Sequence, residues 1–394
     1  MYRKFTVIGI DDNHRQYFPP EVIDIIRKSK VFSGGKRHHE IMSAYLPSVH
    51  IWIDVTVPLS EVFGKYKEYE DITVFASGDP LFYGYATTLQ REFPDCGIKV
   101  YATFNSLQTL AHRLLLPYQD MKNVSITGRP WKNLYDALIE GTPLIGILTD
   151  RNKGPREIAG RMLEYGYDNY EMSVGTALGN DKEEEVATYS LPEACKETFR
   201  NPNCVILRMT HTRKRYFGIP ESEFHHLAGR DNMITKMPVR LLSLSMLDLY
   251  RRQSMWDIGF CTGSVSIEAR LRFPHLRISA FETREESDNL MKMNIRRFGA
   301  PGIEYAIGNF LELDMEIYPR PDAVFIGGHG GKLKEIVDKI NEYLLPDGVI
   351  VFNSVSKESC ELFVSAIHSI NKEITESHTL ALDRYNPITI LKAR

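Results

Sequence analysis

A short apolar segment that runs into a glycine-containing turn constrains this chain more than any other stretch. Met255–Ile258 is typical of a buried strand, and the turn with Gly259 and Gly263 opens a helix. A helix N-terminus presents unpaired N–H groups and the positive end of the helix dipole, so it suits an acidic ligand group. A second strand-like segment, 277–281, ends in Glu282, and an acid there is placed to bind ribose hydroxyls. Together these residues predict a site for a cofactor that contains a nucleoside.

The spacing within this turn distinguishes two kinds of nucleoside cofactor. Nicotinamide cofactors are bound by G-x-G-x-x-G, whereas Cys261 and Ser264 occupy the second and third glycine positions here. The form D-x-G-x-x-x-G, which runs from Asp257 to Gly263, suits S-adenosylmethionine better, as does the polar Asn309 after the third strand of this region. A strand, turn and helix without a ligand is the alternative, because short glycine motifs also match by chance.

Composition and charge limit the class of protein. A chain of 394 residues predicts two or three domains, and 43% hydrophobic with 25% charged residues is ordinary for a globular protein. The net charge of −3 argues against a general nucleic-acid binder. Five separated cysteines without C-x-x-C predict neither disulfides nor a metal site and fit a reducing cytoplasm. No signal peptide is visible, and no apolar run approaches the roughly 18 residues of a membrane helix.

Strand-like and helical patterns alternate along the chain, which predicts α/β architecture and, for the first part, a mostly parallel sheet. The first part holds strand-like segments at 4–9, 31–32, 72–76 and 98–101. A break near 116–120 precedes a second α/β lobe, whose strand-like segments are 124–129, 144–150, 171–176 and 204–208. The charged run 181–185 is interpreted as a solvated turn. Periodicity lapses over 211–232, which indicates a connector, and the segments at 380 and 388–391 resemble a closing antiparallel pair.

Two further segments combine glycine with chemically useful side chains. Ser77–Pro80 follows a strand; alone it is ordinary turn chemistry, but with Leu81–Gly84 it is more specific. His329 lies among four glycines, which indicates that the backbone here packs closely against a ligand or another segment of the chain. The histidine either contacts a substrate or handles a proton, or it is an exposed loop residue. Cys261 is interpreted as a small spacer, because no base is visibly paired with it.

These motifs resemble those of two enzyme families. Residues 1–210 resemble the tetrapyrrole (corrin/porphyrin) methyltransferases in the segments Val7–Ile10, Gly34–His38, Ser77–Gly84, Val124–Arg129 and Leu148–Asp150. Residues 233–394 resemble the decarboxylating precorrin methyltransferases in the segments Met233–Lys236, Val239–Arg240, Asp257–Gly259, Thr262–Glu268 and Ile326–Gly328. The resemblance implies two α/β lobes with a cofactor between them, then the connector 211–232. A Rossmann-like seven-stranded domain follows, with its cofactor at the carboxyl ends of the strands.

The resemblance also implies a function. The first part would methylate C-5 of a precorrin or cobalt-precorrin. The second would methylate C-15 and decarboxylate the C-12 acetate. Both would use S-adenosylmethionine, in cobalamin biosynthesis. Holding an activated sulfonium in line with a nucleophilic carbon is a proximity effect worth up to roughly 7–11 kcal/mol. The alternatives are a methyltransferase for another substrate, such as RNA, and a corrinoid-binding protein with degenerate sites. We further expect a cytoplasmic homo-oligomer without nucleic-acid or membrane partners.

The site residues implied by the motifs fall into three groups. Those for the first cofactor are Gly9, Ser77, Gly78, Asp79, Tyr83, Ser106 and Leu107, and those for the second are Asp257, Gly259, Thr262, Gly263, Ser264, Glu282, Asn309, Phe310, Gly327 and Gly328. Arginine is the preferred partner of carboxylates, so the candidates for substrate binding are Arg37, Lys236, Arg240 and Lys332. The catalytic candidates are His329, as proton donor, and Arg129; for Arg37, His38 and Arg129 a solvated surface position is the alternative.

Three positions depart from the family pattern. Asp11 and Cys261 stand where the families have glycine, and His329 stands where they have a small residue. The first cofactor loop can therefore sit differently, the second turn must accept a β-carbon, and the substrate side of the second site differs in detail.

Overall fold

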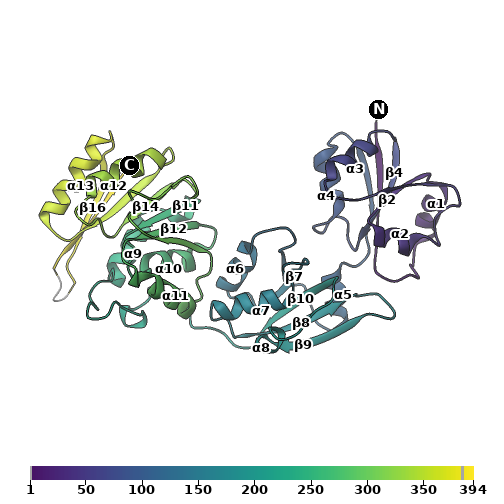
Figure 1. Cartoon of the computed structure of the whole chain (residues 1–394), viewed down its shortest axis with the longest axis horizontal. Helices are drawn as coiled ribbons and strands as arrows, with labels where there is room; N and C mark the ends of the chain where they lie inside the picture. The colour runs from purple at the N-terminus through teal and green to yellow at the C-terminus, as the bar shows by residue number, and fades with distance from the viewer. Residues whose placement is uncertain (1, 383–385) are drawn as a thin grey trace. The chain divides into compact units, whose positions relative to one another are not determined.

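The strands and helices of the chain form three sheets with covering helices, described for residues 2–382 and 386–394 by a computed structural model (Figure 1). The contacts between residues divide the chain into two units. Unit 1 consists of Met1–Pro130, Pro143–Gly160 and Tyr170–Thr210, and unit 2 consists of Trp131–Thr142, Arg161–Asn169 and His211–Arg394.

The first sheet of unit 1 is entirely parallel, with the order β3-β2-β4-β1-β5. Most residues of its central strands β1 and β4 are buried, because helices cover both faces of a parallel sheet. The parallel prediction is confirmed here, although β3 was missed, since this edge strand is mostly exposed. The strands are β1 (Lys4–Ile10), β2 (Val31–Gly34), β3 (Ile51–Asp54), β4 (Asp71–Ser77) and β5 (Gly97–Tyr101). The helices are α1 (Pro20–Lys28), α2 (Lys36–Met42), α3 (Leu59–Tyr66) and α4 (Tyr85–Glu92).

The second sheet of unit 1 has the order β6-β7-β10-β8-β9, and only β6 and β7 pair in parallel. This second lobe is α/β as predicted, but most of its strands pair antiparallel. The short segment 177–184 joins β8 to β9, and parallel strands need longer crossovers. Within the run predicted as a solvated turn, Glu184 pairs with Arg113 and accepts from the Gly179 N–H (2.6 Å), and Glu185 begins β9. The strands are β6 (Lys122–Ser125), β7 (Leu144–Leu148), β8 (Tyr170–Thr176), β9 (Glu185–Ser190) and β10 (Asn203–Met209). The helices along this stretch are α5 (Ser106–Arg113), α6 (Lys132–Ile139), α7 (Pro155–Glu164) and α8 (Leu191–Ala194).

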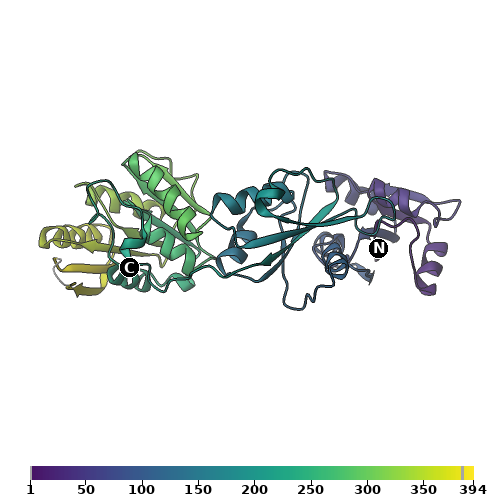
Figure 2. The same cartoon turned by 90° about the horizontal axis from the view of Figure 1, so that it is seen from below.

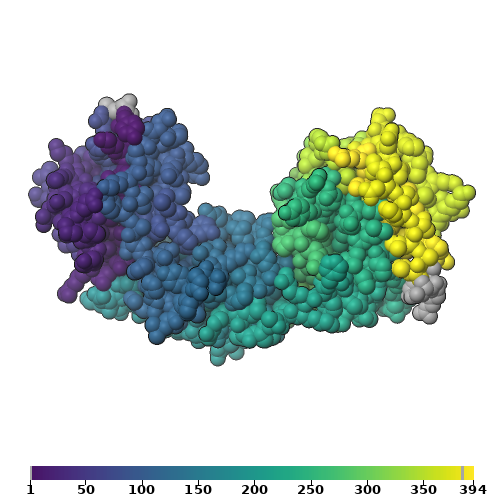
Figure 3. All heavy atoms as spheres, turned by 180° about the vertical axis from the view of Figure 1, so that it is seen from behind, coloured from purple at the N-terminus to yellow at the C-terminus, as the bar shows by residue number. Residues whose placement is uncertain are grey.

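Unit 2 contains a seven-stranded sheet with the order β13-β12-β11-β14-β15-β17-β16, which confirms the predicted Rossmann-like architecture. The first five strands in this order are parallel, and β17 and β16 form the predicted antiparallel pair (Figure 2). The yellow C-terminal segment belongs to the outer surface of this unit, and most side chains of β16 are exposed (Figure 3). The strands are β11 (Ser254–Ile258), β12 (Arg277–Glu282), β13 (Ile303–Ile307), β14 (Ala323–Ile326), β15 (Val349–Ser354), β16 (Ile374–Leu380) and β17 (Ile388–Ala393).

Alternation along β11 divides the core of unit 2 into two layers. Met255 packs among residues of one layer of helices, whereas Trp256 and Ile258 pack among those of the other, as the two-residue repeat of a strand requires. The helices of the first layer are α9 (Met237–Met246), α10 (Ser264–Arg272) and α11 (Glu286–Phe298), and those of the second are α12 (Leu333–Tyr343) and α13 (Lys357–Ser369). Within the described residues, no helix combines the length and the hydropathy needed to cross a membrane.

Two segments outside the sheet contribute to unit 2. In the segment 211–232, Ile219 and Phe224 are buried in the core, so this stretch is packed despite its lack of periodicity. Helix α6 meets α10 through a buried ion pair, because Arg270 Nη2 donates to Asp136 Oδ1 at 2.9 Å. Arg270 is 1% exposed, so its charge depends on this carboxylate and on nearby backbone carbonyls.

Replacing Asp136 with alanine is expected to lower the free energy of unfolding of unit 2 by about 2 kcal/mol. The change leaves the buried Arg270 guanidinium without its carboxylate, although the carbonyl bonds of Arg270 remain. Urea denaturation measures the effect. The control is Lys132→Met, which removes the other cation bound by Asp136 and is expected to cost less than about 1 kcal/mol. Equal effects of the two changes would contradict the assignment.

Candidate functional sites

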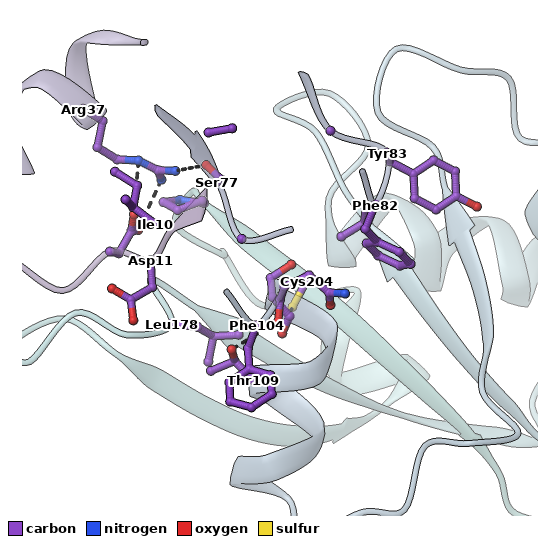
Figure 4. A pocket seen from close by; sticks show the side chains of 18 of the residues that line it. Ile10, Asp11, Arg37, Ser77, Phe82, Tyr83, Phe104, Thr109, Leu178 and Cys204 are labelled. Carbon is purple, nitrogen blue, oxygen red and sulfur yellow. Dashed lines mark hydrogen bonds and ion pairs between the residues drawn. The ribbon is translucent and has the colours of Figure 1, made fainter. Parts of the chain in front are cut away.

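A cavity of about 550 Å³ opens in unit 1 and is lined by residues of both of its sheets (Figure 4). Ile10 and Ser77 line it at the carboxyl ends of β1 and β4, where parallel sheets bind ligands. Thr109 of α5 and Cys204 of β10 line it from the other sheet. The cavity therefore lies between the two lobes of unit 1, where the resemblance implies a cofactor.

Most of the residues predicted for the first cofactor meet at this cavity. Its lining includes Ser77, Gly78, Tyr83 and Ser106, and also Phe104, Thr109, Leu178 and Cys204, which the sequence did not single out. Gly9, Asp79 and Leu107 are not part of that lining. Asp79 Oδ1 accepts from the Leu81 N–H (2.9 Å) and shapes the turn, and Leu107 is fully buried beneath the second sheet.

Close backbone packing explains the glycines of this site. A β-carbon on Gly9 would lie 1.9 Å from the Gly78 carbonyl oxygen, so the end of β1 and the turn after β4 can meet only without a side chain there. Gly78 itself has φ +63°, which favours glycine. On the other wall, Asn105 and Gln108 cap the N-terminus of α5 reciprocally, each side chain accepting from the backbone N–H of the other.

A polar cluster occupies one wall of the cavity. The Arg37 guanidinium binds both oxygens of the Asp12 carboxylate, with Nε 3.2 Å from Oδ1 and Nη1 3.2 Å from Oδ2. Its third nitrogen, Nη2, donates to Ser77 Oγ at 3.1 Å. His38 Nε2 lies 3.0 Å from the same Ser77 oxygen. Burial, with the Arg37 charge as a second cause, lowers the pKa of His38 to about 4, so the ring is neutral at pH 7. Arg37 is thus already paired, and a role in binding substrate carboxylates would have to share it with Asp12.

Asp11 and Arg129 lie near the same cavity. Asp11 lines the cavity, and its Oδ1 accepts from the Asn13 N–H (3.0 Å) and from Gln16 Nε2 (2.6 Å). The aspartate that replaces the family glycine therefore stabilises a local turn. Arg129 is exposed, and its Cζ lies 5.0 Å from the centroid of the Tyr83 ring, a cation–π distance. Arg129 therefore contacts a cavity residue without lining the cavity itself.

The second site centres on Asp257, which is fully buried at the end of β11. Its Oδ2 accepts from the Ser266 N–H (3.1 Å) and from Ser266 Oγ (2.5 Å). Its Oδ1 has no hydrogen-bond partner within the described residues, and the same holds for the buried Oγ1 of Thr262. Because buried polar atoms are ordinarily hydrogen-bonded, these two atoms fit a loop that completes its bonding with a polar ligand.

The turn after β11 packs backbone against backbone on the loop after β14. A β-carbon on Gly259 would lie 2.6 Å from the nitrogen of Gly328, and Gly327 N–H donates to the Ile258 carbonyl (2.8 Å). The glycines around His329 thus pack against the cofactor turn itself. Gly263 has φ +76° and caps the N-terminus of α10. Ser264 is the first residue of that helix and is buried.

Cys261 is held in the turn as a protonated thiol. It has φ +50°, an uncommon conformation for a residue with a β-carbon, and its Sγ donates to the Met233 carbonyl at 3.2 Å. Burial raises the pKa of the thiol to about 11, which excludes a thiolate at neutral pH. Its backbone N–H donates to Glu282 Oε2 at 2.9 Å. The geometry fits the interpretation of Cys261 as a spacer.

Glu282 lies at the end of β12 as predicted, but protein donors already surround it. Arg284 Nη1 lies 3.1 Å from both carboxylate oxygens, and the Thr283 N–H donates to Oε1 at 2.8 Å. A ribose that binds here has to replace or share Arg284, whose side chain is 38% exposed. Arg284 and Ser266 were not singled out from the sequence as site residues, although Ser266 lies within the motif segment Thr262–Glu268.

Asn309 and Phe310 follow β13. Asn309 Oδ1 accepts from the Leu311 N–H (3.2 Å), so its side chain shapes the turn. The Phe310 ring is buried against Trp256 and Phe281, with centroid distances of 5.9 and 5.3 Å, so its side chain belongs to the core.

The prediction for Arg240 is wrong. It was predicted to bind substrate carboxylates, but it is fully buried, and each of its three guanidinium nitrogens donates to protein. Nε donates to Glu268 Oε2 (3.0 Å), and the other two nitrogens donate to the backbone carbonyls of Thr235 and Ile219. Glu268 also accepts from the backbone N–H groups of residues 218 and 219. Arg240 therefore stabilises the fold and is not open to a substrate.

The remaining candidates of the second site stay accessible. His329 is partly buried; its Nδ1 accepts from the Gly331 N–H (3.2 Å), and burial lowers its pKa, so the neutral ring is favoured. Lys332 is exposed immediately before α12, and Lys236 is partly buried immediately before α9. Within residues 2–382 and 386–394, no group of three His, Cys, Asp or Glu side chains is arranged to hold a metal ion.

The state of Asp257 predicts a pH dependence of stability. Burial raises the pKa of Asp257 to about 7. The stabilisation of the folded state by the protonated carboxyl group is therefore fully present below about pH 4 and is lost as the pH rises through 7. Relative to Asp257→Asn, the unaltered protein is expected to lose on the order of 4 kcal/mol across this range. Urea denaturation of the ligand-free proteins at several pH values measures the difference, and parallel pH profiles would contradict it.

Comparisons with known proteins agree in both halves. A family model described as Tetrapyrrole (Corrin/Porphyrin) Methylases matches residues 4–195, and one described as Precorrin methyltransferase domain matches residues 226–392. A Sinorhizobium protein named precorrin-6Y C(5,15)-methyltransferase (decarboxylating) is 29% identical over 90% of this chain and 85% of its own length. A Salmonella typhimurium protein named cobalt-precorrin-6B C(15)-methyltransferase (decarboxylating) is 39% identical over 34% of this chain and 68% of its own. A solved structure of precorrin-6y C5,15-methyltransferase from Geobacter metallireducens is 32% identical, covers 45% of this chain and 96% of that one, and has a TM-score of 0.42.

Proposed function

Because the chain belongs to the decarboxylating precorrin methyltransferases, we propose that it methylates a precorrin or cobalt-precorrin at C-5 and C-15 and removes the C-12 acetate carboxylate, in cobalamin biosynthesis. S-adenosylmethionine is the methyl donor. Residues 1–210 carry the C-5 reaction and residues 233–394 carry the C-15 reaction and the decarboxylation, with 211–232 between them. The observation that carries the proposal is that one chain holds two separate candidate cofactor sites, the cavity at Ser77 and the turn at Asp257.

The residues at each site suit methyl transfer. In each reaction the sulfur–methyl bond breaks and a carbon–carbon bond forms, so the protein has to position the partners and needs no nucleophile of its own. The protonated Cys261 agrees with this chemistry. In the decarboxylation the carbon–carboxyl bond breaks, the conjugated ring takes up the electron pair, and a proton is added to the acetate carbon. We assign proton handling to His329; since its ring is neutral, it must accept a proton before it donates one.

The geometry supports a set of cofactor and substrate roles. Asp257 Oδ1 and Thr262 Oγ1 are available to polar groups of the cofactor in the second site, beside Gly259, Gly263, Ser264, Gly327 and Gly328. Glu282 is proposed to bind ribose once Arg284 is displaced. The proposed partners of the substrate carboxylates are the positively charged side chains of Arg129, Lys236 and Lys332, with Arg37 in part. A cytoplasmic location and a homo-oligomeric state stay predictions from the sequence.

Two measurements test this function. Calorimetric titration of the full chain with S-adenosylhomocysteine is expected to show two equivalents bound. Mass spectrometry of the product from a purified precorrin is expected to show two added methyl groups and one lost carboxyl group. One equivalent would indicate a single working site, and none would favour a corrinoid-binding protein. A single methyl group without loss of carbon dioxide would contradict the assignment of the second site.

A further inference from the structure

The hydrogen bonds around Ser77 determine what its hydroxyl can do. A hydroxyl oxygen has two acceptor lone pairs and one O–H donor. Arg37 Nη2 donates to Ser77 Oγ at 3.1 Å and therefore uses one lone pair. His38 Nε2 lies 3.0 Å from the same oxygen, and the tautomer of the ring decides which of the two atoms donates.

The backbone around His38 selects the tautomer. The Gly35 N–H donates to His38 Nδ1 (3.3 Å), so Nδ1 must offer its lone pair. In a neutral ring the hydrogen then resides on Nε2. His38 Nε2–H therefore donates to Ser77 Oγ, and the second lone pair of the hydroxyl is used.

The donors themselves are held in place from behind. Asp12 binds the Arg37 guanidinium through two of its nitrogens, which orients the third toward Ser77. His38 is the third residue of α2, and Gly34 lets it approach, because a β-carbon there would lie 3.1 Å from His38 Cβ. Ser77, Arg37 and His38 all line the cavity (Figure 4 shows Arg37 and Ser77).

We propose that His38 and Arg37 are positioning residues that leave Ser77 only its O–H to offer, so that Ser77 donates a hydrogen bond to an acceptor group of the ligand in this cavity. The inference rests on the proposed function, in which this cavity binds S-adenosylmethionine and a tetrapyrrole. The acceptor that both molecules carry is a carboxylate. The inference explains why two neighbouring residues of α2 converge on one serine of β4.

Binding and kinetics of four variants of the full chain test the proposal. Ser77→Ala is expected to weaken one binding step about tenfold, the loss of roughly one hydrogen bond to a charged group. His38→Ala is expected to weaken the same step severalfold, and His38→Gln, which keeps an N–H donor, to restore most of it. In Ser77→Ala, the further change His38→Ala is expected to have no effect. Ser43→Ala is the control, because this exposed hydroxyl just after α2 donates to the Glu40 carbonyl and does not line the cavity.

The affected step identifies the carboxylate. Weaker binding of S-adenosylhomocysteine, with unchanged binding of decarboxylated S-adenosylmethionine, places Ser77 on the cofactor. A higher KM for the precorrin in C-5 methylation, with unchanged cofactor binding, places it on the substrate. Both results support the inference. Additive effects of the Ser77 and His38 changes, or no effect of Ser77→Ala, would overturn the inference. The proposed function would still stand if the unaltered chain binds two equivalents of S-adenosylhomocysteine. If the unaltered chain binds only one equivalent of S-adenosylhomocysteine and Ser77→Ala changes no binding step, both the inference and the proposed function would be overturned.

Discussion

Asp257→Ala is expected to abolish C-15 methylation and decarboxylation while C-5 methylation continues. The carboxylate is fully buried, holds Ser266 at the start of α10 through two hydrogen bonds, and keeps one oxygen without a partner among the described residues. Alanine removes both the support of the turn and the acceptor that faces the proposed cofactor. The cavity at Ser77 lies in the other unit and does not depend on this residue.

Mass spectrometry of the product separates the two activities. The expected product of Asp257→Ala has one added methyl group and no lost carboxyl group, and calorimetry is expected to show one equivalent of S-adenosylhomocysteine instead of two. Asp338→Ala serves as the control, because this partly exposed acid of α12 forms a surface pair with Lys334. If C-15 methylation survives in Asp257→Ala, the proposed cofactor site is wrong.

Arg240→Met is expected to lower the free energy of unfolding of unit 2 by about 3–5 kcal/mol. The change leaves Glu268 buried without its cation, and removing one member of a buried pair costs far more than breaking a surface pair. The double variant Arg240→Met with Glu268→Leu is expected to recover much of the loss, because it removes both charges together.

Urea denaturation and kinetics together distinguish this role from substrate binding. Lys334→Met breaks an exposed pair and is expected to cost less than about 1 kcal/mol. If Arg240 bound a substrate carboxylate, Arg240→Met would raise KM while stability stayed close to that of the unaltered protein. That outcome would contradict the burial of Arg240 described above.

The two candidate sites differ in how far local patterns predicted them. The glycines of the Asp257 turn and the acid of β12 are encoded by spacing within about thirty residues, so the sequence predicted where they lie. Arg284 on Glu282 was missed because an arginine two residues after an acid has no spacing signal. In unit 1, Asp12, Arg37 and Ser77 come from three separate segments, and only the parallel pairing of their strands brings them to one edge.

By itself the sequence determined the α/β class and the two glycine-containing turns, because apolar periodicity and glycine conformation act over short stretches of chain. The seven strands of unit 2 were implied by the family resemblance. Only the tertiary structure decided the antiparallel strands of the second sheet, the burial of Arg240 against Glu268 and the ion pair of Asp136 with Arg270. An arginine in a helix has the same local sequence whether it faces a substrate or a buried carboxylate. Its partner is chosen by contacts between segments far apart in the chain, and those contacts form only when the whole core is packed.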